Sequence, residues 1–325
     1  MRIGIYGFGS IGRLIAREAL ERGHELAGVV DANPALVGRD AGEILGLGRL
    51  GVRVSKNPEE LRGSDVVTHA TGSFLDKVCN QILKVIKMSI DVISTCETLA
   101  YPYYRYPKLA RVIDEAAREA EVRVIGTGIN PGFLLDSLVI VVSASVSGVK
   151  RIRAVRSLDA SKRRESFRKK VGLGLTLKEF RYLASKGLVT GHIGYAESVY
   201  LIADAAGLGL DRVEEGQEPV VIKDNVKARE GLVLGIRGYG AGYCKSTEVV
   251  RVELLAYKGA LEYEEIVVKG RNYDVTWRST GTPGDSATSS VILSVAEAVK
   301  QYRPGLLLMS RLLPFRFKFD VNCEG

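Results

Sequence analysis

Short apolar runs alternate with longer amphipathic stretches over the first 136 residues of the chain. The apolar runs have the length of β-strands and cover residues 2–6, 26–30, 65–70, 89–94 and 122–125. Between them, residues 11–20, 75–87 and 108–120 place apolar side chains at helical spacing, with charged side chains on the other face. This alternation predicts an α/β fold with a Rossmann-type doubly wound parallel sheet over residues 1–136.

The pattern changes after this first part, where a helix is expected at residues 134–146. Strands are then expected at residues 149–158, 220–223, 232–239, 248–257 and 262–269. Helices are expected near residues 177–186 and 196–206. The result is an α+β substrate and oligomerisation domain over residues 137–284, mostly antiparallel, with a hairpin turn at Lys258-Gly259 between the last two strands. Residues 285–325, a long helix and an apolar tail, are expected to pack back on the first domain.

Composition narrows the class of protein. A chain of 325 residues exceeds one core, so two domains are expected. Four scattered cysteines and three histidines argue against a metal site and fit a reducing compartment. The sequence contains no secretory signal pattern and no apolar run of membrane length, which predicts a cytoplasmic protein without a membrane partner. Only three glutamines among abundant Lys, Arg and Glu hint at a thermophilic source.

The net charge of +8 is concentrated in residues 150–153 and 162–170. No zinc-finger or RNA-recognition pattern accompanies these charges, so nucleic acid is not expected as a partner. They are interpreted either as a solvated surface or as a basic rim that attracts an anionic cofactor and a carboxylate substrate.

A glycine motif follows the first predicted strand and opens the first predicted helix. Gly7 permits a tight turn, Gly9 lets the backbone approach a pyrophosphate, and Gly12 lets helix and strand pack closely. The helix begins at Ser10 and Ile11, where unpaired N–H groups and the positive end of the helix dipole favour phosphate. This strand–turn–helix context predicts dinucleotide binding.

Cofactor preference depends on the end of the second strand. Asp31 lies 19 residues after Gly12, where a carboxylate accepts hydrogen bonds from an adenosine ribose and repels the 2′-phosphate of NADP. Arg39, a few residues on, can still reach such a phosphate if its loop folds back. NAD is therefore favoured, and NADP stays open.

Other polar residues follow the ends of later strands in the predicted sheet. Because ligands bind beyond the carboxyl ends of parallel strands, these segments are expected to converge on one crevice. The residues expected to contact the cofactor there are Thr71, Gly72, Thr95, Asn130 and Pro131.

Several segments resemble the 2,4-diaminopentanoate dehydrogenase family, which is similar to dihydrodipicolinate reductase in its nucleotide domain. They are residues 95–102, 128–133, 155–162, 191–194 and 304–307. The resemblance implies NAD(P)-dependent oxidative deamination of a diamino acid such as 2,4-diaminopentanoate, giving a keto acid and ammonia. The His-His pair of true dihydrodipicolinate reductases is absent from the sequence, which argues against that exact activity.

Three residues are candidates for the chemistry itself. Glu97 follows a sheet strand, where a carboxylate can bind a substrate ammonium or take its proton; alternatively it caps the next turn or pairs with an arginine. His192, flanked by glycines before a helix, is a proton carrier or a helix cap. Cys96 permits a different interpretation, the nucleophile of an acylating aldehyde dehydrogenase with His69 as base, although a buried thiol and a core histidine are the commoner cases.

Two sites are candidates for holding a substrate carboxylate. Thr282, Asp285 and Ser286 lie where a loop enters the last long helix, so that hydroxyls and N–H groups point together at an anion; simple helix capping is the alternative. Arg163 lies in a basic loop after a strand and can bind a carboxylate through two hydrogen bonds.

The leading hypothesis is an enzyme, an NAD(P)-dependent amine dehydrogenase that acts through an imine on a small amino acid. A reductase of a cyclic imine or semialdehyde, like dihydrodipicolinate reductase, is the second. A dinucleotide-binding regulator without turnover is the third. Exposed strands in the second domain favour a homodimer or homotetramer.

Overall fold

The computed structural model of the protein describes residues 1–221 and 231–321. The chain forms two compact units. Unit 1 comprises residues 1–133 and 283–312, and unit 2 comprises residues 134–282 together with the chain from residue 313 onward.

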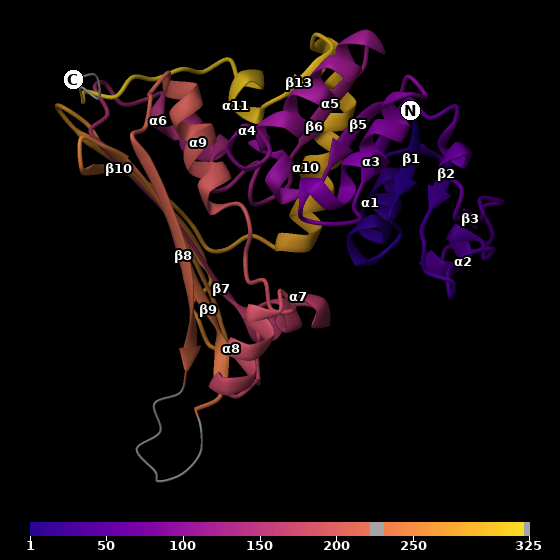
Figure 1. Cartoon of the computed structure of the whole chain (residues 1–325), viewed down its shortest axis with the longest axis horizontal. Helices are drawn as coiled ribbons and strands as arrows, with labels where there is room; N and C mark the ends of the chain where they lie inside the picture. Colours follow the sequence, from indigo (N-terminus) through magenta and orange to yellow (C-terminus); the bar gives the residue numbers. More distant parts are fainter. Residues whose placement is uncertain (222–230, 322–325) are drawn as a thin grey trace. The chain divides into compact units, whose positions relative to one another are not determined.

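Unit 1 contains a seven-stranded sheet in the order β13-β6-β5-β4-β1-β2-β3, in which all pairs of neighbouring strands are parallel. Its strands are β1 (Arg2–Tyr6), β2 (Glu25–Val30), β3 (Val54–Ser55), β4 (Val66–His69), β5 (Asp91–Ser94), β6 (Arg123–Gly126) and β13 (Gly305–Leu307). The strand order reverses direction at β1, as in a doubly wound sheet. The predicted Rossmann-type fold is therefore confirmed (Figure 1).

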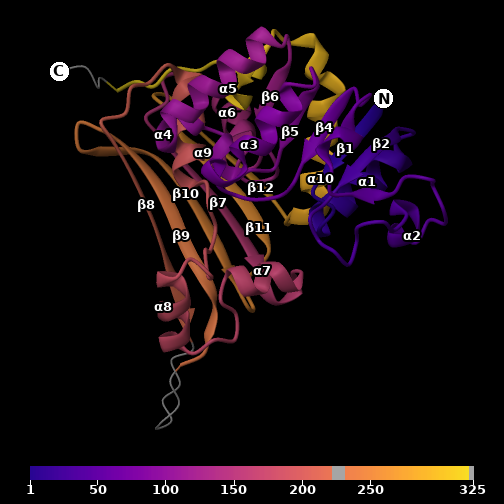
Figure 2. The ribbon, with the colours of Figure 1, turned by 45° about the vertical axis from the view of Figure 1, so that its right-hand side comes forward.

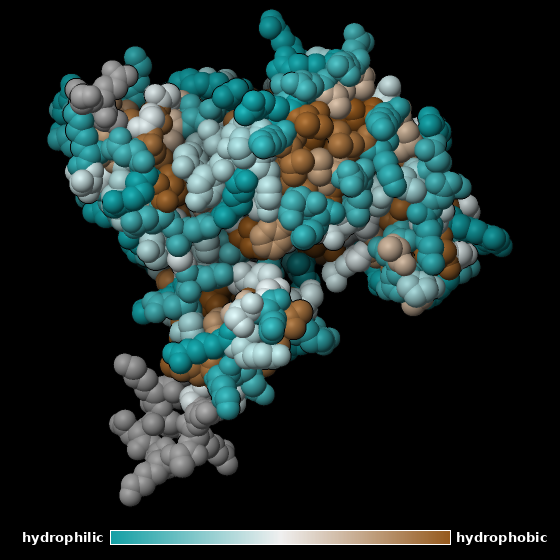
Figure 3. All heavy atoms as spheres, in the orientation of Figure 1, coloured by the Kyte–Doolittle hydropathy of each residue, from teal (hydrophilic) through white to brown (hydrophobic). Residues whose placement is uncertain are grey.

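Helices cover both faces of this sheet (Figures 1 and 2). They are α1 (Ser10–Glu21), α2 (Ala41–Leu45), α3 (Leu75–Ile86), α4 (Pro102–Arg105), α5 (Pro107–Glu119), α10 (Gly284–Ala298) and α11 (Met309–Leu312). One core joins α1 and α10 to the sheet, and a second core joins α3 and α5 to it. Figure 3 shows hydrophilic residues over most of the visible surface of unit 1, with a hydrophobic area in the region of α5.

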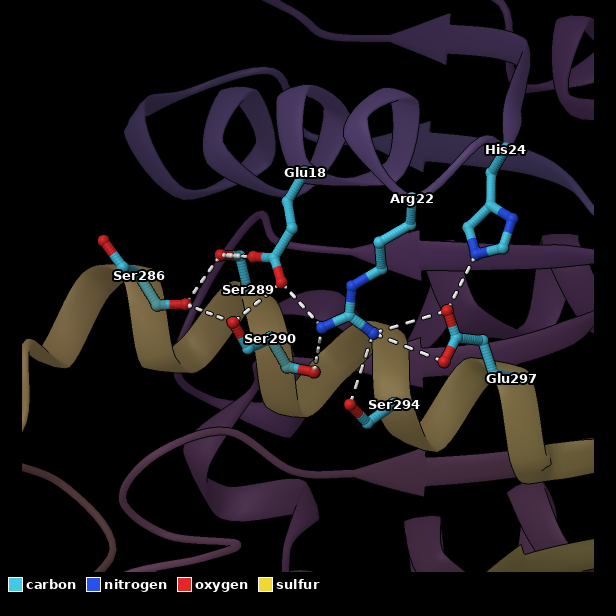
Figure 4. A network of polar contacts seen from close by, with 8 residues as sticks. All are labelled: Glu18, Arg22, His24, Ser286, Ser289, Ser290, Ser294 and Glu297. Carbon is cyan, nitrogen blue, oxygen red and sulfur yellow. Dashed lines mark hydrogen bonds and ion pairs between the residues drawn. The ribbon is translucent and has the colours of Figure 1, made fainter.

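A polar network connects α1 to α10 within unit 1 (Figure 4). The guanidinium of Arg22 lies 2.6 Å from Glu18 and 3.3 Å from Glu297. Glu18 also accepts hydrogen bonds from the hydroxyls of Ser289 and Ser290. These contacts attach a helix from the end of the chain to the helix that follows the glycine motif.

Unit 2 contains a six-stranded mixed sheet in the order β12-β11-β7-β10-β9-β8. Its strands are β7 (Arg151–Asp159), β8 (Arg212–Val221), β9 (Val233–Cys244), β10 (Thr247–Tyr257), β11 (Tyr263–Lys269) and β12 (Asp274–Ser279). Its helices are α6 (Ser137–Ser143), α7 (Glu165–Lys170), α8 (Leu177–Ser185) and α9 (Tyr195–Ala206). The hairpin predicted at Lys258-Gly259 is wrong, because β7 lies between β10 and β11 and runs parallel to β10.

The two faces of this sheet differ in character. One face is apolar and packs against α6 and α9, forming the core of unit 2. On the other face arginine and glutamate side chains form ion pairs, including Arg153 with Glu253 at 2.6 Å and Arg251 with Glu248 at 2.7 Å. The strand predicted at residues 220–223 is the end of β8, and residues 222 and 223 lie outside the described residues.

The predicted segment 285–325 is split between the two units. Residues up to Leu312 belong to unit 1, whereas the following residues belong to unit 2. Phe319 bridges to Val149, and Phe317 is buried in the unit 2 core. Hydrophobic burial of these aromatic side chains explains why the tail does not stay with the first unit.

Two expectations from composition bear on the environment of the protein. Cys244 is disulfide-bonded, whereas Cys79 and Cys96 are free, so the cysteine spacing is not by itself a sign of a reducing compartment. Within residues 1–221 and 231–321, none of the helices has both the length and the apolar composition needed to cross a bilayer.

The α1–α10 network predicts a pH-dependent contribution to stability. We expect Arg22→Met to lower the free energy of unfolding by about 1 kcal/mol at pH 7, because both ion pairs are lost. Burial raises the pKa of Glu18, but hydrogen bonds from Ser289, Ser290 and Arg22 outweigh it and leave this pKa lowered. The hydrogen bond from His24 is the main cause that lowers the pKa of Glu297.

Because both folded-state pKa values are depressed, the contribution is present above the unfolded-state values and disappears as pH falls through the folded-state values. Urea unfolding of wild type and variant at pH 7 and below pH 4 measures it. Arg62→Met is the control, since Arg62 and its partner Glu59 are both more than half exposed. Equal losses for the two variants would contradict the assignment.

Candidate active site

The glycine motif adopts the geometry that close packing requires. Gly7 has φ +97°, and a Cβ added there would lie 2.6 Å from the carbonyl oxygen of Ala70. A Cβ on Gly12 would lie only 1.8 Å from the carbonyl oxygen of Gly7. A Cβ on Gly9, in contrast, would meet no atom within 4 Å. Gly7 and Gly12 are therefore required by the fold, whereas Gly9 faces open space.

The start of α1 leaves N–H groups directed out of the helix. Gly9 is the N-cap, and no side chain caps the helix there. The first four N–H groups of a helix have no partner within it, and the helix dipole is positive at this end. Ser10 and Ile11 thus present N–H groups beside the open position of Gly9, a cradle that fits a pyrophosphate.

Asp31 holds the glycine loop in place. One carboxylate oxygen accepts a hydrogen bond from the N–H of Phe8 at 2.6 Å, and the other accepts from the N–H of Asn33 at 2.8 Å. Sequence reasoning missed this bond to the loop. Each carboxylate oxygen has lone-pair capacity for one further hydrogen bond, so ribose hydroxyls can still bind. Arg39 lies in the following turn and is exposed.

The loop after β4 is built around His69. Burial lowers the pKa of His69 to about 4, so the ring is neutral. Its ring nitrogens lie 2.8 Å from the hydroxyl of Ser94 and 2.9 Å from the hydroxyl of Thr71. His69 is thus a core residue that fixes Thr71, and Gly72 follows as an exposed residue.

The loop after β6 is expected at the crevice, and it contains a buried hydroxyl that is not among the residues expected to contact the cofactor. The hydroxyl of Thr127 is buried and has no hydrogen-bond partner among the described residues. Asn130 and Pro131 follow it and are joined by a cis peptide bond. An orphaned buried hydroxyl at the end of a sheet strand is a candidate donor to a bound ligand. Thr95 begins the neighbouring loop, with its N–H bonded to the carbonyl oxygen of His69 at 2.9 Å.

Cys96 and Glu97 follow β5 but differ in burial. Cys96 is 1% exposed, and burial raises the pKa of its thiol to about 12, which keeps the sulfur protonated. A protonated thiol is a poor nucleophile, so the aldehyde dehydrogenase interpretation is not supported. Glu97 is half-buried and begins the 3₁₀ turn Glu97–Leu99, a position at the same edge of the sheet as the glycine loop.

The remaining candidates belong to unit 2 and to the start of α10. In unit 2, His192 is half-buried before α9, and Arg163 is half-buried with a buried Nε that has no hydrogen-bond partner in the part of the chain described. Thr282 donates from its N–H and its hydroxyl to Glu264. Asp285 and Ser286 lie in the first turn of α10 in unit 1.

A buried ion pair explains the contacts of Thr282. Glu264 lies opposite Arg156 on neighbouring strands, with 3.5 Å between carboxylate and guanidinium, and both are 3% exposed. The anion bound by Thr282 is therefore an internal carboxylate. The capping alternative for Asp285 and Ser286 is wrong, because the N-cap of α10 is Pro283 and no side chain caps this helix.

The fold and the glycine loop define a class, the two-domain dehydrogenases whose Rossmann unit binds a nicotinamide dinucleotide. Residues 1–90 match the family model of the dihydrodipicolinate reductase N-terminus. Residues 133–316 match that of the 2,4-diaminopentanoate dehydrogenase C-terminal domain. The chain belongs to the 2,4-diaminopentanoate dehydrogenase family, and this membership supports an NAD(P)-dependent oxidoreductase that acts on an amine group.

Individual relatives agree with this placement. The chain is 31% identical over 262 residues to 2,4-diaminopentanoate dehydrogenase of Acetoanaerobium sticklandii, covering 76% of this chain and 73% of that protein. It is 27% identical over 238 residues to amine dehydrogenase of Streptomyces virginiae, covering 69% and 64%. The solved amine dehydrogenase of Mycobacterium smegmatis shares the fold with a TM-score of 0.85 at 20% identity, covering 98% and 97%.

The different surroundings of Gly9 and Gly12 predict that alanine lowers stability at Gly12 and weakens dinucleotide binding at Gly9. Gly12→Ala should lower the free energy of unfolding by about 2–3 kcal/mol, since its Cβ meets backbone that must shift. Gly9→Ala should change the free energy of unfolding by less than about 1 kcal/mol, yet weaken NAD binding at least about tenfold.

Urea unfolding and isothermal titration calorimetry with NAD and NADH provide the two readouts. If Gly9→Ala binds the dinucleotide like the wild-type protein, the pyrophosphate does not lie over Gly9.

Proposed function

We propose that this chain catalyses oxidative deamination of an amine carbon in a small diamino acid such as 2,4-diaminopentanoate. The observation that carries the proposal is the match of residues 133–316, outside the nucleotide-binding half, to the diaminopentanoate dehydrogenase family. The family model of the dihydrodipicolinate reductase N-terminus matches residues 1–90, so this match bears on the cofactor rather than on the substrate.

The glycine loop and Asp31 are the proposed cofactor ligands. N–H groups at the start of α1 would hold the pyrophosphate, and the free lone pairs of Asp31 would accept bonds from the ribose. Asp31 favours NAD over NADP by repelling a 2′-phosphate. When bound, the nicotinamide supplies an acceptor for the hydride.

Glu97 is the proposed base. It would bind the substrate ammonium and take a proton from it, so that the neutral amine carbon loses a hydride and becomes an iminium. Water then adds to the iminium carbon, and the C–N bond breaks to give the ketone and ammonia. His192 is proposed to exchange the protons of this second stage, since an imidazole ring has one nitrogen that can accept a proton and one that can donate it. Arg163 is the proposed carboxylate ligand, supported by its buried Nε, for which the described residues supply no hydrogen-bond partner.

We further propose a homo-oligomer formed through unit 2, either a dimer or a tetramer. The polar face of its sheet alternates arginine and glutamate, and Arg251 lies over the ring of Tyr239 at 4.7 Å. Arginine and tyrosine are enriched at protein interfaces, and alternating charge suits a symmetric pairing of identical faces. Cytoplasmic location and a thermophilic source stay predictions from composition.

Turnover assays test the proposed reaction. Purified protein with NAD or NADP and a panel of diamino acids should form reduced nicotinamide, measured by absorbance, together with ammonia in equal amount. Glu97→Gln should lower kcat about a hundredfold while leaving the Kd for NAD unchanged, because it removes the base but not the cofactor site. Binding of NAD without oxidation of any amine would overturn the proposed reaction and leave the reductase and the regulator as alternatives. Full activity of Glu97→Gln would make Glu97 structural.

Replacement of Asp31 tests cofactor choice. Asp31→Ser should raise the ratio of kcat/KM for NADP to that for NAD by about tenfold or more, since the repulsion of a 2′-phosphate is removed. Arg39→Ala is the matched variant and should reduce whatever activity remains with NADP. An unchanged ratio in Asp31→Ser would show that another group sets the preference.

A further inference from the structure

The segment that carries His192 lacks regular secondary structure. Residues 190–194 lie before α9 in neither a helix nor a strand, and Gly191 and Gly194 have φ of +61° and +107°. The backbone groups of such a segment need partners from elsewhere if the segment is to hold one conformation.

Gln217 on β8 supplies two of these partners. Its side-chain oxygen accepts a hydrogen bond from the N–H of His192 at 3.0 Å. Its side-chain nitrogen donates to the carbonyl oxygen of Thr190 at 2.8 Å. A Cβ on Gly191 would lie 2.0 Å from the side-chain oxygen of Gln217, so the amide fills the space beside this glycine. One amide therefore fixes the backbone on both sides of Gly191.

The ring of His192 is held as well. It packs edge-on against the ring of Tyr195, with centroids 4.7 Å apart and planes at 85°. Tyr195 is 3% exposed and lies against β9, where a Cβ on Gly238 would come within 2.3 Å of its hydroxyl oxygen. The next residue, Ala196, donates its N–H to Glu215 on β8 at 3.2 Å. Side chains of β8 thus hold both the loop and the start of α9.

We propose that Gln217 is a positioning residue that holds His192 in the orientation needed for proton exchange with the substrate. This inference rests on the proposed function, in which His192 carries protons. Gln217 acts through the backbone of its neighbour and touches no reacting atom, so its effect is one of geometry.

The charged and titratable groups around this segment determine how a variant at Gln217 changes the surroundings of the His192 ring. They are Glu215 on β8, Tyr195 on α9, whose hydroxyl is kept neutral because burial raises its pKa, and Lys170 on α7, whose carbonyl oxygen accepts from the N–H of Gly191. Gln217→Glu keeps an acceptor for His192 and adds a carboxylate, which raises the pKa of a nearby imidazole. Gln217→Met keeps the volume and removes both hydrogen bonds.

Nuclear magnetic resonance of the histidine rings provides a readout that needs no turnover. The sequence has only three histidines, so the ring signals can be assigned with His24→Asn and His192→Asn variants. Gln217→Met should shift or broaden the His192 signals while those of His24 and His69 stay in place. Gln217→Glu should move the titration midpoint of His192 to higher pH by about half a unit or more.

The same variants should change catalysis in a matching way. In Gln217→Met, kcat for amine oxidation should fall about tenfold with a smaller change in KM, because the proton carrier is misplaced. In Gln217→Glu, the limb of the pH–rate profile that reports His192 should move with its titration midpoint. Glu218→Gln is the control, since Glu218 points to the opposite face of β8 and pairs with exposed Arg237 at 2.7 Å.

Each outcome decides the proposal. Unchanged His192 signals in both Gln217 variants, or equal changes in Glu218→Gln, would overturn it. A changed titration midpoint with an unmoved pH–rate profile would also overturn it, since His192 would then carry no proton. If Gln217→Met does not fold, the isosteric Gln217→Glu variant decides. If the wild-type protein oxidises no amine, the proposed function fails, while the ring signals still show whether Gln217 positions His192.

Discussion

Hydrogen bonds that continue the parallel ladder one residue beyond the strands of unit 1 determine where its site lies. They run from Gly7 N–H to Val30, from Ala70 N–H to Tyr6, from Thr95 N–H to His69 and from Thr127 N–H to Ser94, at 2.7–2.9 Å. Each loop therefore starts at the same level of the sheet. Residues that are more than a hundred positions apart in sequence gather at one edge because the buried strands allow no slip in register.

The sequence predicted those parts of the fold whose signals are local. The strands of unit 1 are apolar because helices cover both faces, and the glycine motif has its own turn chemistry, so both were predicted correctly. β8 was seen only at its end, because the run from Arg212 to Glu218 is acidic and lies at an edge of the sheet. The insertion of β7 between β10 and β11 has no local signal, since that pairing joins distant parts of the chain.

Burial explains which candidate groups remain available for chemistry. Desolvation disfavours the charged form of any group, so His69 stays neutral and the thiol of Cys96 stays protonated, each at an end of a strand. Glu97 follows Cys96 directly but is half-buried, so its side chain is partly accessible to solvent. Residue type and spacing alone do not distinguish these neighbours, because the difference lies in which side chain the turn after β5 directs inward.

The two units hold their candidate residues by different means, and this matches the way the family resemblances divide. In unit 1 the glycine loop is fixed by the close packing of Gly7 and Gly12, by a backbone bond to Val30 and by the carboxylate of Asp31. In unit 2 the loop of His192 is fixed by the amide side chain of Gln217 on an edge strand and by a backbone bond from Gly191 to Lys170. The glycine loop lies within residues 1–90, which match the dihydrodipicolinate reductase N-terminus, whereas the loop of His192 lies within residues 133–316, which match the narrower family.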